Sequence, residues 1–378
     1  MRKTVHIITE KIFDRYQNQF TIGGLQTYVF ELSKFLSRYY RVILHEKTDS
    51  NFTQKYEGVV IIGNSNFRTF QNLFDSIYNK SDIYIVATDQ LPIKSKESNV
   101  IVIQHGIAFD FSREERDEWW SKSSFLTHIN KFSRCIRNIK RYQYIQNTVC
   151  VDYNYFNWLR TLSWIESPNK LLCIPNFASY VKEEKEINSK LAKNRQRISI
   201  LFARRFEEYR GALLFANIVE RLLIETDNID FTFAGSGPLE NFLNDKFRNN
   251  DRVTITSFNS IDSVDFHYHY DIAIVPTKSS EGTSLSLIEA MAAGCFPICT
   301  YVGGMSNIII DNFNGRIVYP DEKSIYEGIV DVVNMKKEEF NRVVRDSYNT
   351  AKNGFSKENW SNKWLKFIEE IIYILALK

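Results

Sequence analysis

Two glutamates separated by seven residues are the side chains best placed to contact a ligand. Glu281 lies in a loop after the apolar run DIAIVPT, and Glu289 falls in the second turn of a predicted helix that Thr283 or Ser284 can cap. Free N–H groups at such a helix start would suit a diphosphate, Glu289 could accept hydrogen bonds from both hydroxyls of a ribose, and Glu281 could reach a sugar ring. The alternative is a surface glutamate followed by an ordinary capped helix.

Two arginines five positions apart could balance the charge of such a diphosphate. Arg205 and Arg210 follow the apolar run ISILFA, and Gly211 comes next. Cations at the end of a strand would neutralise the charge that develops on a departing nucleoside diphosphate. A plain basic surface loop is the alternative interpretation.

Two pairs of glycines could bring the backbone close to a ligand. Gly235 and Gly237, in FAGSGPLE, permit a tight turn near a nucleotide, but a glutamate occupies the third glycine position of a dinucleotide fingerprint. Gly23 and Gly24 precede the first long predicted helix, where their backbone could approach a phosphate or a sugar. A purely structural turn is the alternative for both pairs.

A histidine and a basic segment complete the candidates. His105 immediately follows the apolar run NVIVIQ, a position from which it could reach a ligand, although a lone histidine is more often structural. The segment KFSRCIRNIKRY, residues 131–142, has five cations and no acid, with Phe132, Ile136 and Ile139 expected on the other face. Such a helix could lie on an anionic membrane surface or pack, solvated, on its own domain.

Short apolar runs that alternate with helical patterns must position these residues. In the first half the runs are VHIIT, RVILH, GVVII, DIYIVAT, NVIVIQ, TVCV and LLCIP, and in the second half ISILFA, FTFAG, VTITS, DIAIVP, FPICT and RIVYP. Two such series predict two doubly wound parallel sheets, whose ligands sit beyond the carboxyl ends of the strands. We expect a first domain over residues 1–182, a polar linker over 183–197, a second domain over 198–355, and a final helix over 356–378 that crosses back to the first.

The composition excludes several classes of protein. The 378 residues are too many for one compact core, and the net charge of +3 gives no whole-protein attraction to nucleic acid. No run approaches the ~20 apolar residues that span a bilayer, and the start MRKTVHIITEKIF does not resemble a secretory signal. Five cysteines in apolar contexts favour reduced thiols, so we expect a cytosolic protein. We expect no bound metal, because the chain has no Asp-x-Asp and no His/Asp cluster with ligand spacing.

The run EGTSLSLIEAMAAGCFPICTYVGG resembles the Glu-x7-Glu signature of glycosyltransferase family 4, whose members are retaining enzymes of the GT-B fold. The resemblance implies that Glu281 contacts hydroxyls of the donor sugar and that Glu289 binds the ribose. It also implies that the intervening backbone holds the diphosphate, through Gly282, Thr283, Ser284 and Leu285.

Other segments resemble the same family. LFARRFEEYRG is similar to its Gly-Arg-Leu and Lys-Gly pattern, with Arg204 in place of the glycine and Arg210 in place of the lysine. Arg205 and Arg210 would then stabilise the leaving diphosphate. FAGSGPLE resembles its Gly-x-Gly-Pro turn. The resemblance further implies that His105 reaches the outer hydroxyls of the sugar, and that Gly23 and Gly24 face the donor.

These patterns together predict a GT-B protein: two Rossmann-like, doubly wound parallel-sheet domains facing each other across a cleft, the first for the acceptor and the second for the nucleotide-sugar. The expected reaction is metal-independent, retaining transfer of a hexose from a UDP- or GDP-linked donor to a hydroxyl of a glycan. The resemblance to bacterial surface-polysaccharide enzymes implies a lipid-linked acceptor and a place in the cytoplasm, on the inner face of the cell membrane. A nucleotide-sugar epimerase and a non-catalytic sugar-binding protein are the alternatives.

Overall fold

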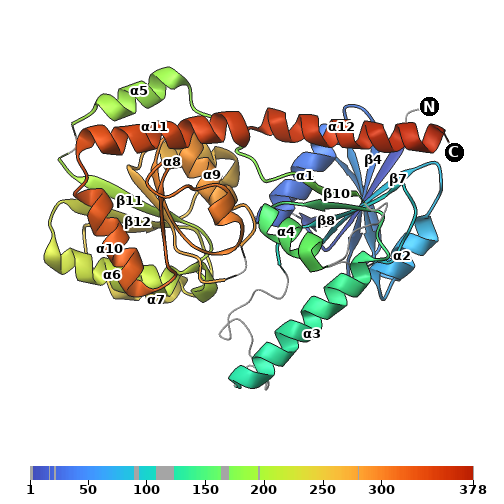
Figure 1. The fold of residues 1–378 in the computed structure, drawn as a ribbon, viewed down its shortest axis with the longest axis horizontal. Coiled ribbons are helices and arrows are strands. Elements are labelled where there is room, and N and C mark those ends of the chain that lie inside the picture. The colour runs from blue at the N-terminus through green and yellow to red at the C-terminus, as the bar shows by residue number, and fades with distance from the viewer. Residues whose placement is uncertain are drawn as a thin grey trace. The chain divides into compact units, whose positions relative to one another are not determined.

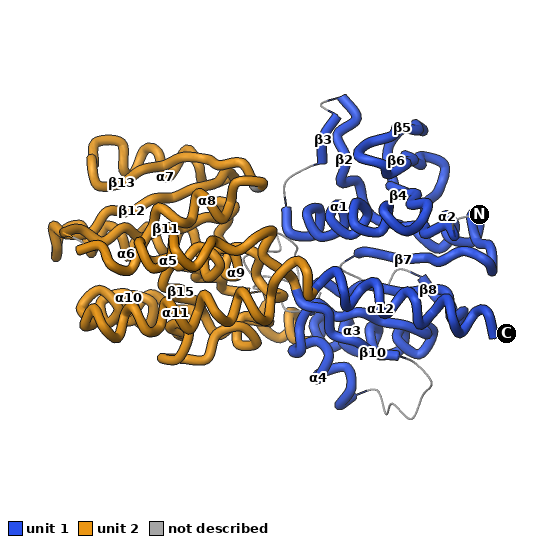
Figure 2. Tube along the Cα trace, turned by 90° about the horizontal axis from the view of Figure 1, so that it is seen from above, with its two compact units in different colours: residues 1–109, 129–175, 360–378 blue, residues 110–128, 176–359 orange. Residues whose placement is uncertain are grey.

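The chain folds into two compact units. The computed structural model describes residues 3–16, 18–20, 23–88, 93–107, 123–162, 170–194, 196–279 and 281–377. Unit 1 consists of Met1–Phe109, Ile129–Pro175 and Trp360–Lys378, and unit 2 of Asp110–His128 and Asn176–Asn359 (Figure 2). The chain therefore crosses between the units more than once, and its last residues belong to unit 1.

Unit 1 is built on an eight-stranded sheet in the order β10-β9-β8-β7-β1-β4-β6-β5. Its strands are β1 (Thr4–Thr9), β4 (Arg41–Lys47), β5 (Phe52–Tyr56), β6 (Val59–Asn64), β7 (Ile83–Thr88), β8 (Val100–Gln104), β9 (Asn147–Cys150) and β10 (Lys170–Cys173). All neighbours are parallel except β5, which runs antiparallel to β6. A small antiparallel pair, β2 (Phe13–Asp14) and β3 (Gln19–Phe20), follows β1.

Helices accompany the sheet of unit 1 (Figure 1), and most of them have a buried apolar face. They are α1 (Gly24–Leu36), α2 (Phe70–Ile77), the part of α3 (Ser124–Tyr142) that begins at Ile129, α4 (Tyr153–Leu162) and the part of α12 (Lys357–Ala376) that begins at Trp360. Every side chain of β7 and β8 is buried, as expected for central strands of a parallel sheet with helices on its faces. Trp364 of α12 is fully buried and donates a hydrogen bond from Nε1 to the hydroxyl of Tyr28 in α1, at 2.8 Å.

Unit 2 is built on a six-stranded, wholly parallel sheet in the order β13-β12-β11-β14-β15-β16. The strands are β11 (Ile198–Ala203), β12 (Ile229–Ala234), β13 (Val253–Thr256), β14 (Ile272–Val275), β15 (Phe296–Thr300) and β16 (Arg316–Val318). Because all are parallel, the segments that follow their carboxyl ends emerge along one edge of the sheet.

The helices of unit 2 alternate with its strands (Figure 1). They are α5 (Glu184–Ala192), α6 (Ala212–Glu225), α7 (Glu240–Phe247), α8 (Ser263–Tyr268), α9 (Leu285–Ala292), α10 (Glu322–Val333) and α11 (Lys337–Gly354). A core of aromatic and branched side chains, including Phe202, Phe215 and Phe233, packs beneath α6.

The structure confirms all thirteen strands that the apolar runs predict, together with the helix after Gly23 and the long terminal helix. The expectation of a linker over residues 183–197 is wrong. Residues 184–192 form α5, which starts with a capping box between Glu183 and Glu186. Ile187 and Leu191, one turn apart, are buried in the core of unit 2, and the buried Lys190 donates a hydrogen bond to the carbonyl of Ala293 at 3.1 Å, so these side chains dock an otherwise polar helix.

Candidate active site

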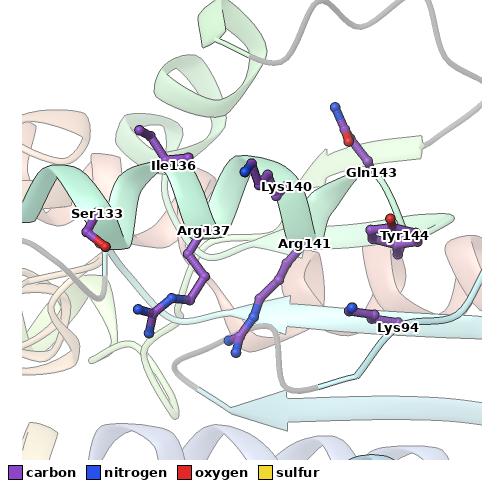
Figure 3. A pocket seen from close by; sticks show the side chains of 8 residues that line it. All are labelled: Lys94, Ser133, Ile136, Arg137, Lys140, Arg141, Gln143 and Tyr144. Atoms are coloured by element: carbon purple, nitrogen blue, oxygen red, sulfur yellow. The ribbon is translucent and has the colours of Figure 1, made fainter.

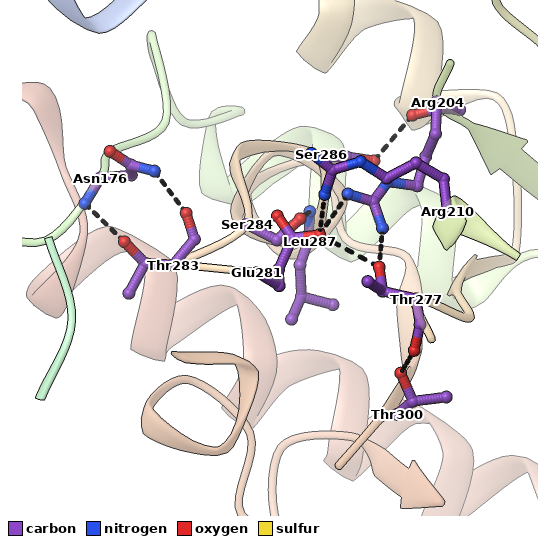
Figure 4. Close-up of polar contacts among 11 residues, drawn as sticks. Asn176, Arg204, Arg210, Thr277, Glu281, Thr283, Ser284, Ser286, Leu287 and Thr300 are labelled. Carbon is purple, nitrogen blue, oxygen red and sulfur yellow. Dashed lines mark hydrogen bonds and ion pairs between the residues drawn. The ribbon is translucent and has the colours of Figure 1, made fainter. Parts of the chain in front are cut away.

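An ion cluster lies at the carboxyl edge of the sheet in unit 2. Arg204 follows β11 directly, and its Nη2 lies 2.6 Å from Oε2 of Glu281, in the segment after β14. Arg210 pairs with the same oxygen of Glu281, and the hydroxyl of Thr277 donates a hydrogen bond to this oxygen at 3.0 Å (Figure 4). Arg204 also donates to the hydroxyl of Thr277. Three donors from two segments therefore converge on one carboxylate oxygen.

Burial makes this cluster electrostatically strong. The side chains of Arg204 and Glu281 are only 7% and 10% exposed, and that of Arg210 is 24% exposed. Burial alone would raise the pKa of Glu281, but the charges of Arg204 and Arg210 outweigh this effect and hold the pKa below its usual value. Two cations and one anion leave the cluster with a net positive charge, which suits an anionic ligand.

Close backbone packing brings the arginines to this position. Gly211 has a left-handed backbone, and a Cβ there would lie 2.1 Å from the carbonyl oxygen of Pro276, which follows β14. The turn that carries Arg210 can therefore approach the end of β14 only with glycine at this point. At Gly235 a Cβ would lie 2.1 Å from the carbonyl oxygen of Arg204, so this glycine serves close packing on the Arg204 backbone.

Gly237 is constrained in the same way. A Cβ at Gly237 would lie 2.8 Å from the carbonyl oxygen of Phe206, whose N–H donates to Ser236 O at 2.8 Å. Close packing of the backbone in this turn is thus sufficient to explain why both positions are glycine, without a contact to a ligand.

The N-terminus of α9 is fixed next to Glu281. Ser284 is the N-cap residue and accepts a hydrogen bond from the N–H of Leu287, while Ser286 Oγ donates to the carbonyl of Ala203 at the end of β11, at 2.9 Å. Thr283 is buried, and its hydroxyl accepts a hydrogen bond from the N–H of Asn176 at 2.9 Å (Figure 4). These contacts hold the helix start rigidly at the edge where the arginines end, in an arrangement that could bind an anion.

The remaining residues of the Glu-x7-Glu segment follow from this geometry. Gly282 links Glu281 to Thr283, and Leu285 is the first residue of α9. Glu289 accepts a hydrogen bond on Oε2 from Ser263 Oγ of α8, at 2.7 Å. Burial raises the pKa of Glu289 to about 7 despite this hydrogen bond. With this pKa, the charge on the Glu289 carboxyl is sensitive to a ligand that binds beside it.

Arg205 does not join the ion cluster. Its side chain is 64% exposed and pairs with Glu207, Nη2 to Oε1, at 2.8 Å. The spacing of Arg205 and Arg210 predicted one pair of cations, whereas the structure brings Arg204 and Arg210 together at Glu281. The role of Arg204 was missed because the resemblance places a glycine at this position; two adjacent arginines after a strand end were the available signal.

Two further contributors were not assigned from the sequence. Thr277 connects Arg204 with Glu281, and its own carbonyl accepts a hydrogen bond from Thr300 at 2.6 Å. Gly303 has a left-handed backbone, and a Cβ there would lie 1.8 Å from the carbonyl oxygen of Glu281. The adjacent Gly304 donates its N–H to that carbonyl at 3.0 Å. The GG pair of TYVGG was the visible signal, since only glycine allows such an approach.

The candidates in unit 1 lie at the ends of its own elements. His105 directly follows β8, and its ring packs edge-on against Tyr28 of α1, with centroids 5.0 Å apart. Gly23 is the N-cap residue of α1, Gly24 begins the helix, and the carbonyl of Gly23 accepts a hydrogen bond from Thr27 at 2.9 Å. The contacts of these three residues do not test whether they bind a ligand.

Part of the sequence is similar to known glycosyltransferases. A match to the family "Glycosyl transferases group 1" covers residues 183–349. An uncharacterized glycosyltransferase of Methanocaldococcus jannaschii is 27% identical over 219 residues, which are 54% of this chain and 60% of that protein. The chain thus spans less than two thirds of this relative's length.

Solved structures match the chain over nearly its full length. Sucrose-phosphate synthase from Thermosynechococcus elongatus has a TM-score of 0.72 at 13% identity, covering 99% of this chain and 100% of that one. HepE of Anabaena in complex with UDP has a TM-score of 0.69 at 9% identity, covering 97% and 100%. The pneumococcal O-GlcNAc transferase GtfA in complex with UDP and GlcNAc has a TM-score of 0.66 at 12% identity, covering 98% and 99%. The fold is therefore GT-B, and the segment that matches the group 1 family model lies within unit 2.

Within the described residues, no helix is both long and apolar enough to cross a bilayer.

Proposed function

We propose that the protein is a retaining glycosyltransferase of family 4 that transfers a hexose from a UDP- or GDP-linked sugar to a hydroxyl of a glycan. The observation that carries the proposal is the Arg204–Glu281–Arg210 cluster beside the N-terminus of α9, within the segment that matches the group 1 family. The complexes of HepE with UDP and of GtfA with UDP and GlcNAc support this class of donor.

The proposed step breaks the bond between the anomeric carbon and the diphosphate and forms a bond from that carbon to the acceptor oxygen. The proton of the acceptor hydroxyl passes to the leaving diphosphate on the same face of the sugar, so the anomeric configuration is retained. Negative charge develops on the diphosphate as the bond breaks. Arg205, Arg210 and the amides at the start of α9 are the groups we propose to stabilise it.

Each remaining residue has a proposed task. Glu281 orients the donor sugar, and Arg204 is a positioning residue that holds this carboxylate. Glu289 accepts the hydroxyl hydrogens of the ribose. We propose His105, Gly23 and Gly24 as contacts of the bound substrate from unit 1. No divalent metal takes part, and positioning with electrostatics supplies most of the rate enhancement.

The acceptor in this proposal is a lipid-linked glycan, used in surface-polysaccharide synthesis at the inner face of the cell membrane. The resemblance of the Glu-x7-Glu segment to bacterial enzymes of that type supports this part of the proposal.

A thermal-shift panel of nucleoside diphosphates and nucleotide-sugars tests the donor site. A ligand present at a hundred times its dissociation constant adds ~2.7 kcal/mol of apparent stability, so the cognate nucleotide should stand out. Turnover of that donor is then measured with and without glycan acceptors, and the anomeric configuration of the product is read by NMR. A transferred sugar of unchanged configuration supports the proposal. Release of a free, altered sugar indicates an epimerase, and binding without turnover indicates a sugar-binding protein.

A further inference from the structure

A hollow of about 680 Å³ lies against helix α3 in unit 1 (Figure 3). It is lined by Lys94, Ser133, Ile136, Arg137, Lys140, Arg141, Gln143 and Tyr144. Four of the eight side chains are cations and none is acidic. Arg137 and Arg141, one turn apart, extend from the same side of α3, with Lys94 nearby.

The cations of this hollow lack acidic partners. Within the described part of the chain, no ion pair involves Lys94, Arg137, Lys140 or Arg141. Lys94 instead lies 5.1 Å from the ring centroid of Tyr144. Like charges held close together repel one another, and an anion in the hollow would relieve this repulsion.

The sequence predicted only part of this arrangement. Five cations were expected on one face of residues 131–142, but three of them line the hollow. Arg134 is half-buried and donates from Nε to Asn130 within the helix, at 2.9 Å, and Lys131 is also half-buried. Lys94 and Tyr144 come from segments outside the helix, so periodicity within the helix could not reveal them.

An apolar stripe runs along α3 beside the cations. Ile129, Phe132 and Ile136 follow one another at i, i+3 and i+7, so they lie on one face of the helix, and they are 49%, 68% and 37% exposed. Ile136 also borders the hollow. Exposed apolar side chains next to unpaired cations match the two layers of an anionic bilayer surface, which presents phosphates above acyl chains.

We propose that α3 docks unit 1 on an anionic phospholipid surface. The cations of the hollow bind phosphate oxygens of lipid headgroups, and the apolar stripe enters the boundary of the acyl chains. The site serves the proposed function by bringing the enzyme to a lipid-linked acceptor, but its binding to lipid does not depend on the nucleotide site.

The test is co-sedimentation of the full chain with phosphatidylcholine vesicles that contain or lack phosphatidylglycerol. Wild-type protein should bind only the anionic vesicles, and less as salt rises. Replacing both Arg137→Gln and Arg141→Gln should weaken binding at least tenfold, and Phe132→Ser should do the same without any change of charge. The matched control is Arg248→Gln with Lys323→Gln, which removes two exposed cations from unit 2. It should bind as wild type does.

Several results would overturn the docking surface. These are absence of wild-type binding at low salt, equal losses in the control and the hollow variant, and wild-type binding by Phe132→Ser. Displacement by millimolar inorganic phosphate at constant ionic strength would make the hollow a site for small anions instead. Unchanged thermal midpoints and nucleotide affinities in all variants show that folding and the nucleotide site are intact. A failed nucleotide panel with intact vesicle binding would contradict the proposed function alone.

Discussion

At the scale of single residues, the site divides into buried groups that hold one another and exposed groups that can reach a ligand. Arg204 and Glu281 are almost fully buried and pair with each other, whereas Arg205 is mostly exposed and pairs with Glu207. Arg210 lies between these extremes. The degree of burial therefore distinguishes arginines that can hold another side chain from arginines that can reach a ligand, a distinction that residue spacing alone does not make.

Arg205 and Arg210 should act on the transition state. Because the charge of the leaving diphosphate is greatest there, we expect Arg205→Gln and Arg210→Gln each to lower kcat by about 10²–10³, with a smaller effect on donor affinity. Steady-state kinetics and calorimetry with the cognate donor measure the two quantities. Wild-type kcat in both variants would place the diphosphate contacts elsewhere.

Arg204 should behave differently from Arg205. Arg204→Gln removes one charge from a buried carboxylate and releases Glu281, so turnover of the nucleotide-sugar should fall. Affinity for the bare nucleoside diphosphate should stay near wild type, because Glu281 is proposed to contact the sugar only. An equal loss of affinity for nucleoside diphosphate and nucleotide-sugar would mean that Arg204 itself binds phosphate.

Glu289 should make donor affinity depend on pH. Its pKa of about 7 means that the free protein loses the proton only near neutrality, and ribose hydroxyls donate best to the ionised form. Donor affinity should therefore rise about tenfold between pH 6 and pH 8. Calorimetry should use a nucleotide-sugar, since the terminal phosphate of a free diphosphate also titrates near pH 6. Glu289→Gln should bind more weakly, with a flat profile; a wild-type slope in this variant would assign the pH dependence to another group.

At the scale of elements, the sequence predicts whatever depends on local pattern and misses what depends on distant partners. Central parallel strands are apolar throughout, so all thirteen runs identify strands correctly. β5, with the sequence FTQKY, was missed because an edge strand with one exposed face carries alternating polar residues. α5 was taken for a linker because the few side chains that dock it are a small part of a charged segment.

The terminal helix α12 should be essential to the stability of unit 1. Trp364 is fully buried, and its N–H is bonded to the buried hydroxyl of Tyr28. Trp364→Ala removes this bond and leaves a large cavity, at an expected cost of about 3–5 kcal/mol in the free energy of unfolding. Urea unfolding measures this cost, and Tyr28→Phe is the milder control, at about 1–3 kcal/mol for an unpaired indole N–H. Unfolding of Trp364→Ala at the wild-type urea concentration would contradict the burial of this helix.

At the scale of the whole molecule, the sequence predicts the GT-B fold, and the site only in part. The Glu-x7-Glu segment predicts the N-capped helix α9 and the place of Glu281. Which arginine meets Glu281 depends on the close approach of strand ends at Gly211 and Gly303. Arg204 and Arg210 lie 77 and 71 residues before Glu281 in the chain, a separation that no local spacing records. Lys94 and Tyr144 at the basic hollow escape prediction for the same reason.

Metal independence is proposed for the chain as a whole and gives the last prediction. A nucleoside diphosphate carries charge that many enzymes balance with a divalent ion held by carboxylates. This chain has no Asp-x-Asp, and its described residues contain no group of three or more His, Cys, Asp or Glu placed to hold a metal. We propose that the cations Arg205 and Arg210 and the N-terminus of α9 balance this charge without a bound ion.

We therefore expect turnover of the cognate donor to be unchanged, within twofold, in excess EDTA. The control is the same assay with magnesium or manganese restored after chelation, which should add nothing. Activity that disappears in EDTA and returns with either ion would assign the diphosphate charge to a metal, and the arginines would then serve to position the donor. The Arg210→Gln variant separates these outcomes further. If the arginines replace a metal, added magnesium should rescue part of its lost turnover, because a free cation can then bind the uncompensated diphosphate.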